Sequence, residues 1–211
     1  RGVTALPWTV VVTHAHFDHC FGTGALLACQ VFAHARCVAA LAADGEAYRQ
    51  EWIERYRRQG RPEMAEALAE ARLVIPAALP ADRAELSVGG REVVFTHLGR
   101  GHTDHDLLVQ VPDAGVLFTG DLVENGAPPA IGADAYLAEW APTLDAVVDL
   151  LGAGTAVPGH GDPVDAGFVA TQRDELAVLA GLVAAVRTGE LDAADAIRRS
   201  PYPEATTRDA L

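Results

Sequence analysis

The 211-residue chain contains no lysine, few cysteines and no apolar run long enough to cross a membrane. All 16 of its basic residues are therefore arginine, which excludes Schiff-base chemistry on lysine and any lysine contact to an anionic substrate. The three cysteines, an odd and sparse set, indicate reduced thiols and predict a cytoplasmic location. The short apolar runs predict that no segment enters the membrane.

The chain is strongly acidic, with 29 aspartate and glutamate residues and a formal net charge of −13. It has no basic stripe, which argues against a nucleic-acid partner and favours a small-molecule substrate. Half of the residues are hydrophobic, enough to bury one sizeable core. We therefore expect a single domain over residues 1–211, with a helical insertion at about residues 35–72.

Three of the eight histidines fall within six residues, directly after the apolar segment Val10–Val12. His14 and His16 alternate along an expected strand end and so point the same way. Asp18 and His19 follow where the chain turns. Imidazole and carboxylate donors together suit zinc, iron or manganese. A purification tag would not follow an apolar strand with an aspartate in register, so we interpret the run as a metal site.

Three further motifs follow apolar strands later in the chain: Gly101-His102-Thr103, Thr119-Gly120-Asp121 and Pro158-Gly159-His160-Gly161. His105 is an alternative to His102, which we favour because it directly follows Gly101. Asp121 has a competing interpretation as the cap of the segment that follows it, but its place at the end of an expected strand favours a metal ligand. Glycines on both sides of His160 fit a backbone that passes close to an ion.

Together these motifs, in this order, resemble the signature of the metallo-β-lactamase superfamily, from about Trp8 to the helix after Pro163. The resemblance implies an α+β fold, a four-layer αβ/βα sandwich. It also implies two metal positions with a bridging aspartate. The first position would be held by His14, His16 and His102, the second by Asp18, His19 and His160, and Asp121 would join them.

The resemblance further implies a hydrolase with two divalent ions, zinc first and iron or manganese as alternatives, that share a hydroxide. Asp18 would be catalytic, orienting the nucleophile and passing a proton to the leaving group. Classical zinc β-lactamases carry a cysteine or serine where this chain has Asp121, so the site resembles those of the thioester, lactone and phosphoester hydrolases of the superfamily. We expect a small ester, thioester, lactone or β-lactam as substrate, with Asn125 and Tyr136 as substrate contacts.

Two other functions stay open at this point. A mononuclear iron persulfide dioxygenase shares the histidine run but uses fewer of these residues as ligands, so metal stoichiometry and oxygen uptake separate it from the hydrolase. The third reading is a non-catalytic binding module, against which the intact set of seven ligands argues.

Secondary structure follows from hydrophobic spacing and turn residues. We expect hairpins at residues 87–98 and 106–119. Helices are expected at residues 25–28, 133–151 and 165–188, and a strand at residues 30–33. Residues 35–72 are expected to form a helical block whose aromatic face carries Tyr48, Trp52 and Tyr56. This block is either a helix pair docked on the core, or a lid or homodimer surface over the active site. His34 and His97 match no motif, and Cys20 is expected to be a buried thiol.

Only thirteen residues precede the histidine run, whereas relatives of this kind usually place several strands there. Val10–Val12 are apolar at every position, as in a strand with neighbours on both sides. We therefore expect the natural protein to carry further strands before Arg1, without which the first sheet is incomplete.

Overall fold

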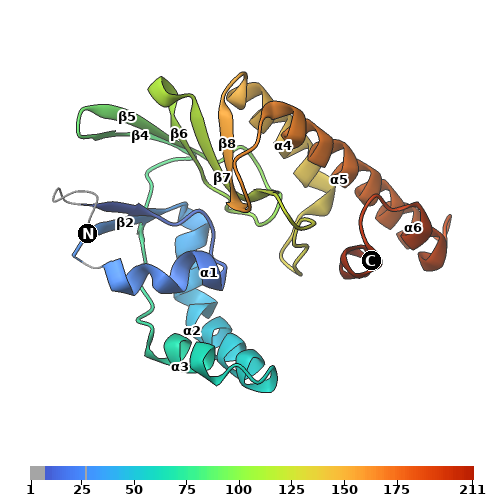
Figure 1. The fold of residues 1–211 in the computed structure, drawn as a ribbon, viewed down its shortest axis with the longest axis horizontal. Helices are drawn as coiled ribbons and strands as arrows, with labels where there is room; N and C mark the ends of the chain where they lie inside the picture. Colours follow the sequence, from blue (N-terminus) through green and yellow to red (C-terminus); the bar gives the residue numbers. More distant parts are fainter. Residues whose placement is uncertain (1–7, 27) are drawn as a thin grey trace. The chain divides into compact units, whose positions relative to one another are not determined.

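The computed structural model describes residues 8–26 and 28–211, and it has helices and two β-sheets, which confirms the predicted α+β class (Figure 1). The chain divides into two compact units, one up to Ala81 and one from Asp82 onward. We call them unit 1 and unit 2 and describe each by itself. The single-domain organisation stays a prediction. Within the described residues, no helix is both long and apolar enough to span a membrane.

Unit 1 is built on three short parallel strands in the order β1-β2-β3. They are β1 (Thr9–Val11), β2 (Gln30–Ala33) and β3 (Ala77–Ala78). The strand expected at residues 30–33 is thus confirmed. In the part of the chain that the structure describes, β1 pairs with β2 alone. Strands before Arg1 stay a prediction.

Two short helical segments lie between β1 and β2: α1 (Phe17–Cys20) and a 3₁₀ helix (Phe21–Leu26). The 3₁₀ helix begins ahead of the short helix expected at 25–28 and overlaps its first two residues. That expected helix includes residue 27, which lies outside the described residues.

The expected helical block consists of α2 (Ala35–Arg58) and α3 (Pro62–Glu70). The Nδ1 of His34 accepts a hydrogen bond from the Arg36 N–H and so caps α2. Both helices bury apolar side chains in the core of unit 1, which also holds Val12 and Val31. The buried members from the helices are Cys37, Leu41, Ile53, Tyr56, Ala65 and Leu68. The helix pair is thus docked on the core of unit 1, while the lid and homodimer-surface alternatives stay predictions.

Arg49 ties α2 to the end of α3. Its Nη1 donates to the carbonyl oxygens of Leu68, Ala69 and Ala71, at 2.8, 3.0 and 3.2 Å. Its Nη2 pairs with Glu46 one turn earlier on α2, at 2.7 Å. The last carbonyl groups of a helix lack intrahelical donors, and here one guanidinium supplies them.

Unit 2 contains a five-stranded sheet in the order β4-β5-β6-β7-β8, in which the β7–β8 pair is parallel and the others are antiparallel. The strands are β4 (Arg83–Val88), β5 (Arg91–Thr96), β6 (Leu108–Val111), β7 (Val116–Glu124) and β8 (Thr155–His160). Both predicted hairpins are confirmed. The first turns through Gly89 and Gly90, both at positive φ, and begins at residue 83 rather than 87.

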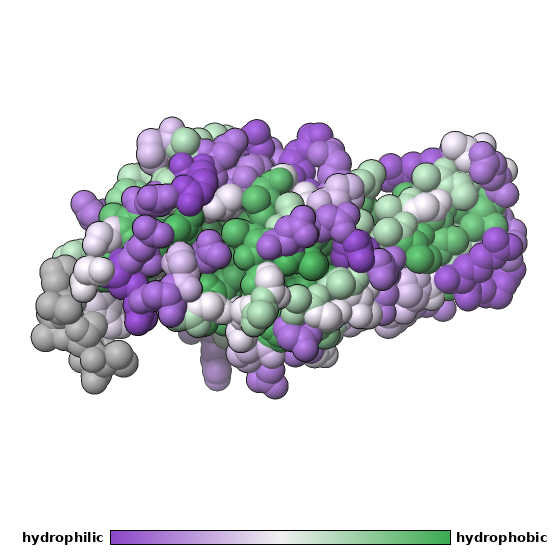
Figure 2. Space-filling view, turned by 90° about the horizontal axis from the view of Figure 1, so that it is seen from above, coloured by the Kyte–Doolittle hydropathy of each residue, from purple (hydrophilic) through white to green (hydrophobic). Residues whose placement is uncertain are grey.

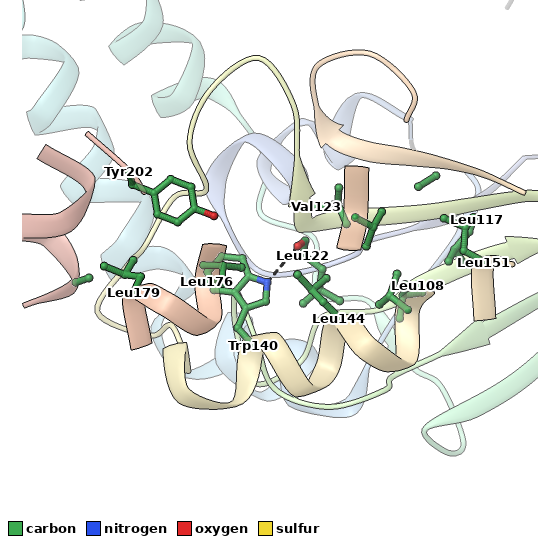
Figure 3. Packing of buried hydrophobic residues seen from close by; sticks show 14 of the residues in the cluster. Leu108, Leu117, Leu122, Val123, Trp140, Leu144, Leu151, Leu176, Leu179 and Tyr202 are labelled. Carbon is green, nitrogen blue, oxygen red and sulfur yellow. Dashed lines mark hydrogen bonds between the residues drawn. The ribbon is translucent and has the colours of Figure 1, made fainter. Parts of the chain in front are cut away.

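Helices α4 (Leu137–Leu151) and α5 (Ala166–Arg187) lie side by side in Figure 1 and confirm the two predicted amphipathic helices. They are followed by α6 (Ala193–Arg199) and α7 (Glu204–Ala210), which the sequence analysis did not anticipate. Apolar side chains of α4 and α5 pack on β6 and β7 around the fully buried Trp140 (Figure 3). The Trp140 indole N–H donates to the Leu122 carbonyl oxygen at 3.1 Å. This bond joins α4 to β7, the strand that carries Asp121.

Charged side chains lie mainly at the surface, and hydrophilic residues cover much of the face shown in Figure 2. Among the described residues, the acids that are buried are Asp106, Asp121 and Glu124, all of unit 2. A buried carboxylate is stable only with hydrogen-bond donors or cations around it. These three acids therefore mark the part of unit 2 in which a functional site is expected.

Candidate metal centre

Unit 1 gathers the four donors of the histidine run. His14 and His16 follow β1, whereas Asp18 and His19 lie on α1. The ring centroids of His14 and His16 are 4.8 Å apart, and those of His14 and His19 are 4.1 Å apart. The Oδ2 of Asp18 is 3.7 Å from the Nε2 of His19. The local chain thus brings all four expected ligands of this unit together.

Cys20 directly follows His19 and is a buried thiol, as expected. Its Sγ donates to the Ala15 carbonyl oxygen at 3.5 Å. Burial raises the pKa of Cys20 far above its usual range. The donors that the structure gathers for a metal in unit 1 are imidazole and carboxylate groups.

In unit 2, two histidines face one carboxylate oxygen. Asp121 lies on β7 and His160 ends β8, its parallel neighbour, so both lie toward the carboxyl ends of adjacent strands. The Oδ2 of Asp121 is 3.6 Å from the Nε2 of His102 and 3.5 Å from the Nε2 of His160. Donors about 2.0–2.2 Å from a tetrahedral ion are separated by roughly 3.3–3.6 Å. Each of the two histidine–Asp121 separations therefore fits a pair of ligands on one cation.

His102 lies in the loop between β5 and β6, which Asp106 holds in shape. The two oxygens of Asp106 accept hydrogen bonds from the Thr103 N–H and hydroxyl, both at 2.8 Å. His105 points elsewhere, with its Nδ1 2.6 Å from the Asp104 Oδ1. Of the two histidines weighed for this motif, the structure thus places His102 beside Asp121. His97, which matches no motif, contacts the backbone of the same loop.

At both glycine positions of the Pro-Gly-His-Gly motif, a larger side chain would collide with neighbouring atoms. A Cβ on Gly159 would lie 1.8 Å from the Asp121 Oδ1, so only glycine leaves room for that carboxylate. A Cβ on Gly161 would lie 2.0 Å from the Asn125 carbonyl oxygen, and its φ of +88° also favours glycine. The sequence predicted that these glycines let the backbone pass close to an ion. What they allow in the structure is the close approach of β8 and the residue after it to β7 and the residue after it.

The two expected substrate contacts both help to hold this end of unit 2. The Asn125 side-chain amide donates to the Asp162 carbonyl oxygen at 3.1 Å. The Tyr136 N–H donates to the Gly101 carbonyl oxygen at 2.8 Å, and the Arg100 guanidinium lies 4.3 Å from the Tyr136 ring centroid. Both side chains are half-buried, and their contact with a substrate stays a prediction.

Each unit thus presents imidazole and carboxylate donors, which fit a borderline divalent ion. Two buried acids, Asp106 and Glu124, belong to no ligand motif and were not predicted as site residues from the sequence. The one sequence signal is spacing, because Asp106 lies four residues after His102 and Glu124 lies three residues after Asp121. Nothing in the sequence separates such an acid from an exposed loop residue.

Comparison with known proteins agrees with this geometry. The family model described as the metallo-beta-lactamase superfamily matches residues 9–160. A metallo-beta-lactamase type 2 from Bacillus cereus is 28% identical over 163 residues, which cover 76% of this chain and 54% of the relative. The chain therefore spans about half the length of the curated relatives it matches first.

Solved structures show the same fold at low sequence identity. A metallo-beta-lactamase from Pontibacter korlensis superposes with a TM-score of 0.62 at 22% identity, covering 81% of this chain and 69% of that one. A double mutant of the sec-alkyl sulfatase PisA1 gives a TM-score of 0.74 at 18% identity, covering 99% of this chain and 41% of that one.

Proposed function

Because the chain belongs to the metallo-beta-lactamase superfamily, we propose that it is a dinuclear metal-dependent hydrolase, with zinc as the first candidate metal. Family membership and the imidazole and carboxylate clusters support a metal-dependent hydrolase in general. The finer assignment follows the sequence motifs. One ion would be held by His14, His16 and His102, the other by Asp18, His19 and His160, and Asp121 would bridge the two.

One observation carries the proposal: two imidazole nitrogens face the same oxygen of a buried carboxylate in unit 2. An aspartate that only capped a neighbouring segment would instead accept hydrogen bonds from backbone N–H groups. The Gly159 backbone, moreover, leaves space for this carboxylate and for no side-chain atom of its own. The position of Asp121 between His102, in a loop, and His160, at the end of β8, therefore supports its assignment as a ligand.

The bound ions would lower the pKa of a bound water to about 7 and would polarise the scissile carbonyl. Asp18, which is exposed beside His19, would orient the attacking water and hold the proton that passes to the leaving group. The substrate class that follows is a small ester, thioester, lactone or β-lactam. Asn125 and Tyr136 would contact it, and no lysine is present to pair with an anionic group.

The metal assignment is tested by elemental analysis of wild type and of two variants, Asp121→Asn and His105→Ala. We expect two divalent ions per wild-type chain and fewer in Asp121→Asn, which keeps the shape of the side chain but removes its charge. Turnover should fall strongly in that variant while its thermal melt stays close to wild type. His105→Ala is the matched control and should keep both ions. Wild-type metal content and rate in Asp121→Asn would overturn the dinuclear assignment.

His14→Ala tests whether both units serve one centre. If they do, this variant should lose metal as His102→Ala does, although the two residues lie in different units. If each unit bound metal independently, each variant would instead keep the ion bound by the unit that was not changed.

The substrate class is tested with chromogenic esters, thioesters, lactones and a cephalosporin. A second candidate, hydrolysis of a sulfate ester, is favoured by the fold similarity to a sec-alkyl sulfatase over 99% of this chain. Release of sulfate from an alkyl sulfate separates it from the carbonyl substrates. Oxygen uptake with a persulfide, together with one iron per chain, would instead support the dioxygenase reading.

A further inference from the structure

Glu124 is a buried acid that the proposed ligand set does not use. It is the last residue of β7 and is 6% exposed. Its Oε1 accepts a hydrogen bond from the backbone N–H of Ala130 at 2.8 Å. A carboxylate-to-amide bond of this length is a strong, charge-assisted contact. Glu124 therefore binds the chain again six residues after its own position.

The sequence between these residues explains why Ala130 is the donor. Residues 125–129 form a loop that leaves β7, and Pro128 and Pro129 stand at its end. Proline has no backbone N–H. Ala130 is the first residue after the two prolines that can donate, and its bond to Glu124 closes the loop.

The other polar group of Ala130 contacts a proposed metal ligand. The Ala130 carbonyl oxygen is 3.1 Å from the Nδ1 of His102. A carbonyl oxygen only accepts hydrogen bonds, so this contact requires the proton of a neutral imidazole to sit on Nδ1. The lone pair is then on Nε2, the atom that faces Asp121. Ala130 thus selects the tautomer and the ring orientation that a metal ligand needs.

Glu124 itself is held from α5. Its backbone N–H donates to the Oε1 of the buried Gln172 at 3.1 Å. The Nε2 of Gln172 donates to the Leu122 carbonyl oxygen at 2.9 Å, which also accepts the Trp140 indole bond drawn in Figure 3. The end of β7 is therefore anchored to α4 and α5 before the loop begins.

We propose that Glu124 is a positioning residue for His102, acting through Ala130. The N–H and the C=O of Ala130 belong to different peptide groups, so the effect is geometric: Glu124 fixes where the carbonyl lies, and the carbonyl fixes the imidazole. The effect of Glu124 on metal binding rests on the proposed function. Its effect on the tautomer and orientation of the His102 ring does not.

The first test is the tautomer of His102 in metal-free protein, read from the ring nitrogens by ¹H–¹⁵N correlation NMR of ¹⁵N-histidine protein. The His102→Gln spectrum identifies the His102 signals. In wild type at a pH where the ring is neutral, Nδ1 should carry the proton. Glu124→Ala should shift His102 toward a mixture of tautomers, while Glu124→Gln, which keeps an oxygen acceptor for Ala130, should restore the wild-type pattern.

The second test is metal affinity, measured by competition with a chromophoric chelator. Loss of such a supporting contact typically weakens binding by about 10- to 100-fold, and we expect this for Glu124→Ala. Glu124→Gln and Glu92→Ala, which changes an exposed acid of β5, should stay close to wild type. Thermal melts of all variants identify any that fail to fold.

The outcomes separate the two proposals. A wild-type His102 with its proton on Nε2, or a Glu124→Ala variant with wild-type tautomer and affinity, would overturn the positioning role. Failure of Glu124→Gln to restore the tautomer of a folded protein would also overturn it. If wild type bound no divalent ion, the proposed function would fail, yet the tautomer comparison would still decide the role of Glu124.

Discussion

Replacing Gly159 with alanine tests the tightest contact of the candidate site. The added Cβ would lie 1.8 Å from the Asp121 Oδ1 and 2.9 Å from the Gly120 carbonyl carbon. Heavy atoms that are not bonded repel strongly well before such a separation. To open that contact to about 3.0 Å, the carboxylate or the strand must move by roughly 1.2 Å. Gly159 does not have a positive φ, so the backbone itself accepts alanine and the effect is steric.

A shift of this size displaces the oxygen that faces both His102 and His160. Misplacement of a reacting group by about 1 Å costs on the order of 100-fold in rate, and loss of ligand support costs about 10- to 100-fold in metal affinity. We therefore expect Gly159→Ala to bind zinc at least about 10-fold more weakly in a chelator competition. Overpacking should also lower the free energy of unfolding by about 1–3 kcal/mol.

Gly154→Ala is the matched control, because its Cβ would lie 2.6 Å from the Gly115 carbonyl oxygen just ahead of β8, remote from Asp121. It should destabilise the fold to a similar degree and leave zinc affinity unchanged. Equal zinc affinity in wild type and Gly159→Ala would refute the steric reasoning. An equal loss of affinity in both variants would show that the effect is general destabilisation.

Three further predictions concern unit 1. Arg49→Ala removes the donors to three carbonyl oxygens at the end of α3. Hydrogen bonds from a charged group contribute about 1.5–3 kcal/mol, so urea unfolding should show a fall in the free energy of unfolding within that range. An unchanged free energy of unfolding would contradict this role. A thiol reagent at pH 8 should modify the half-exposed Cys29 first, because Cys20 and Cys37 are buried. Since folding raises the pKa of Cys20 through burial, its contribution to stability is complete below the usual thiol pKa and declines as the pH rises above it. Wild type should therefore lose stability faster than Cys20→Ala in alkaline melts, and parallel pH curves would contradict the raised pKa.

Much of the fold was predictable because its signals are local. The Gly89-Gly90 turn places both hairpin strands, and the spacing of apolar residues identifies α4 and α5. The starts of these elements were less accurate. α4 begins at Leu137 rather than at residue 133, with Tyr136 at its N-cap and bonded to Gly101. That bond joins residues 35 positions apart in sequence, which no local pattern contains.

The sequence by itself determined which residue types are available as ligands and the order in which they follow apolar strands. Only the tertiary structure decided that His102 rather than His105 faces Asp121, since both follow the same strand and differ in where the Asp106 bonds aim the loop. It also decided that Gly159 is needed for the Asp121 carboxylate and that Glu124 reaches Ala130. Strand and helix patterns depend on near neighbours along the chain. The direction of a side chain depends on contacts with residues far away in sequence, and those exist only once the sheet has formed.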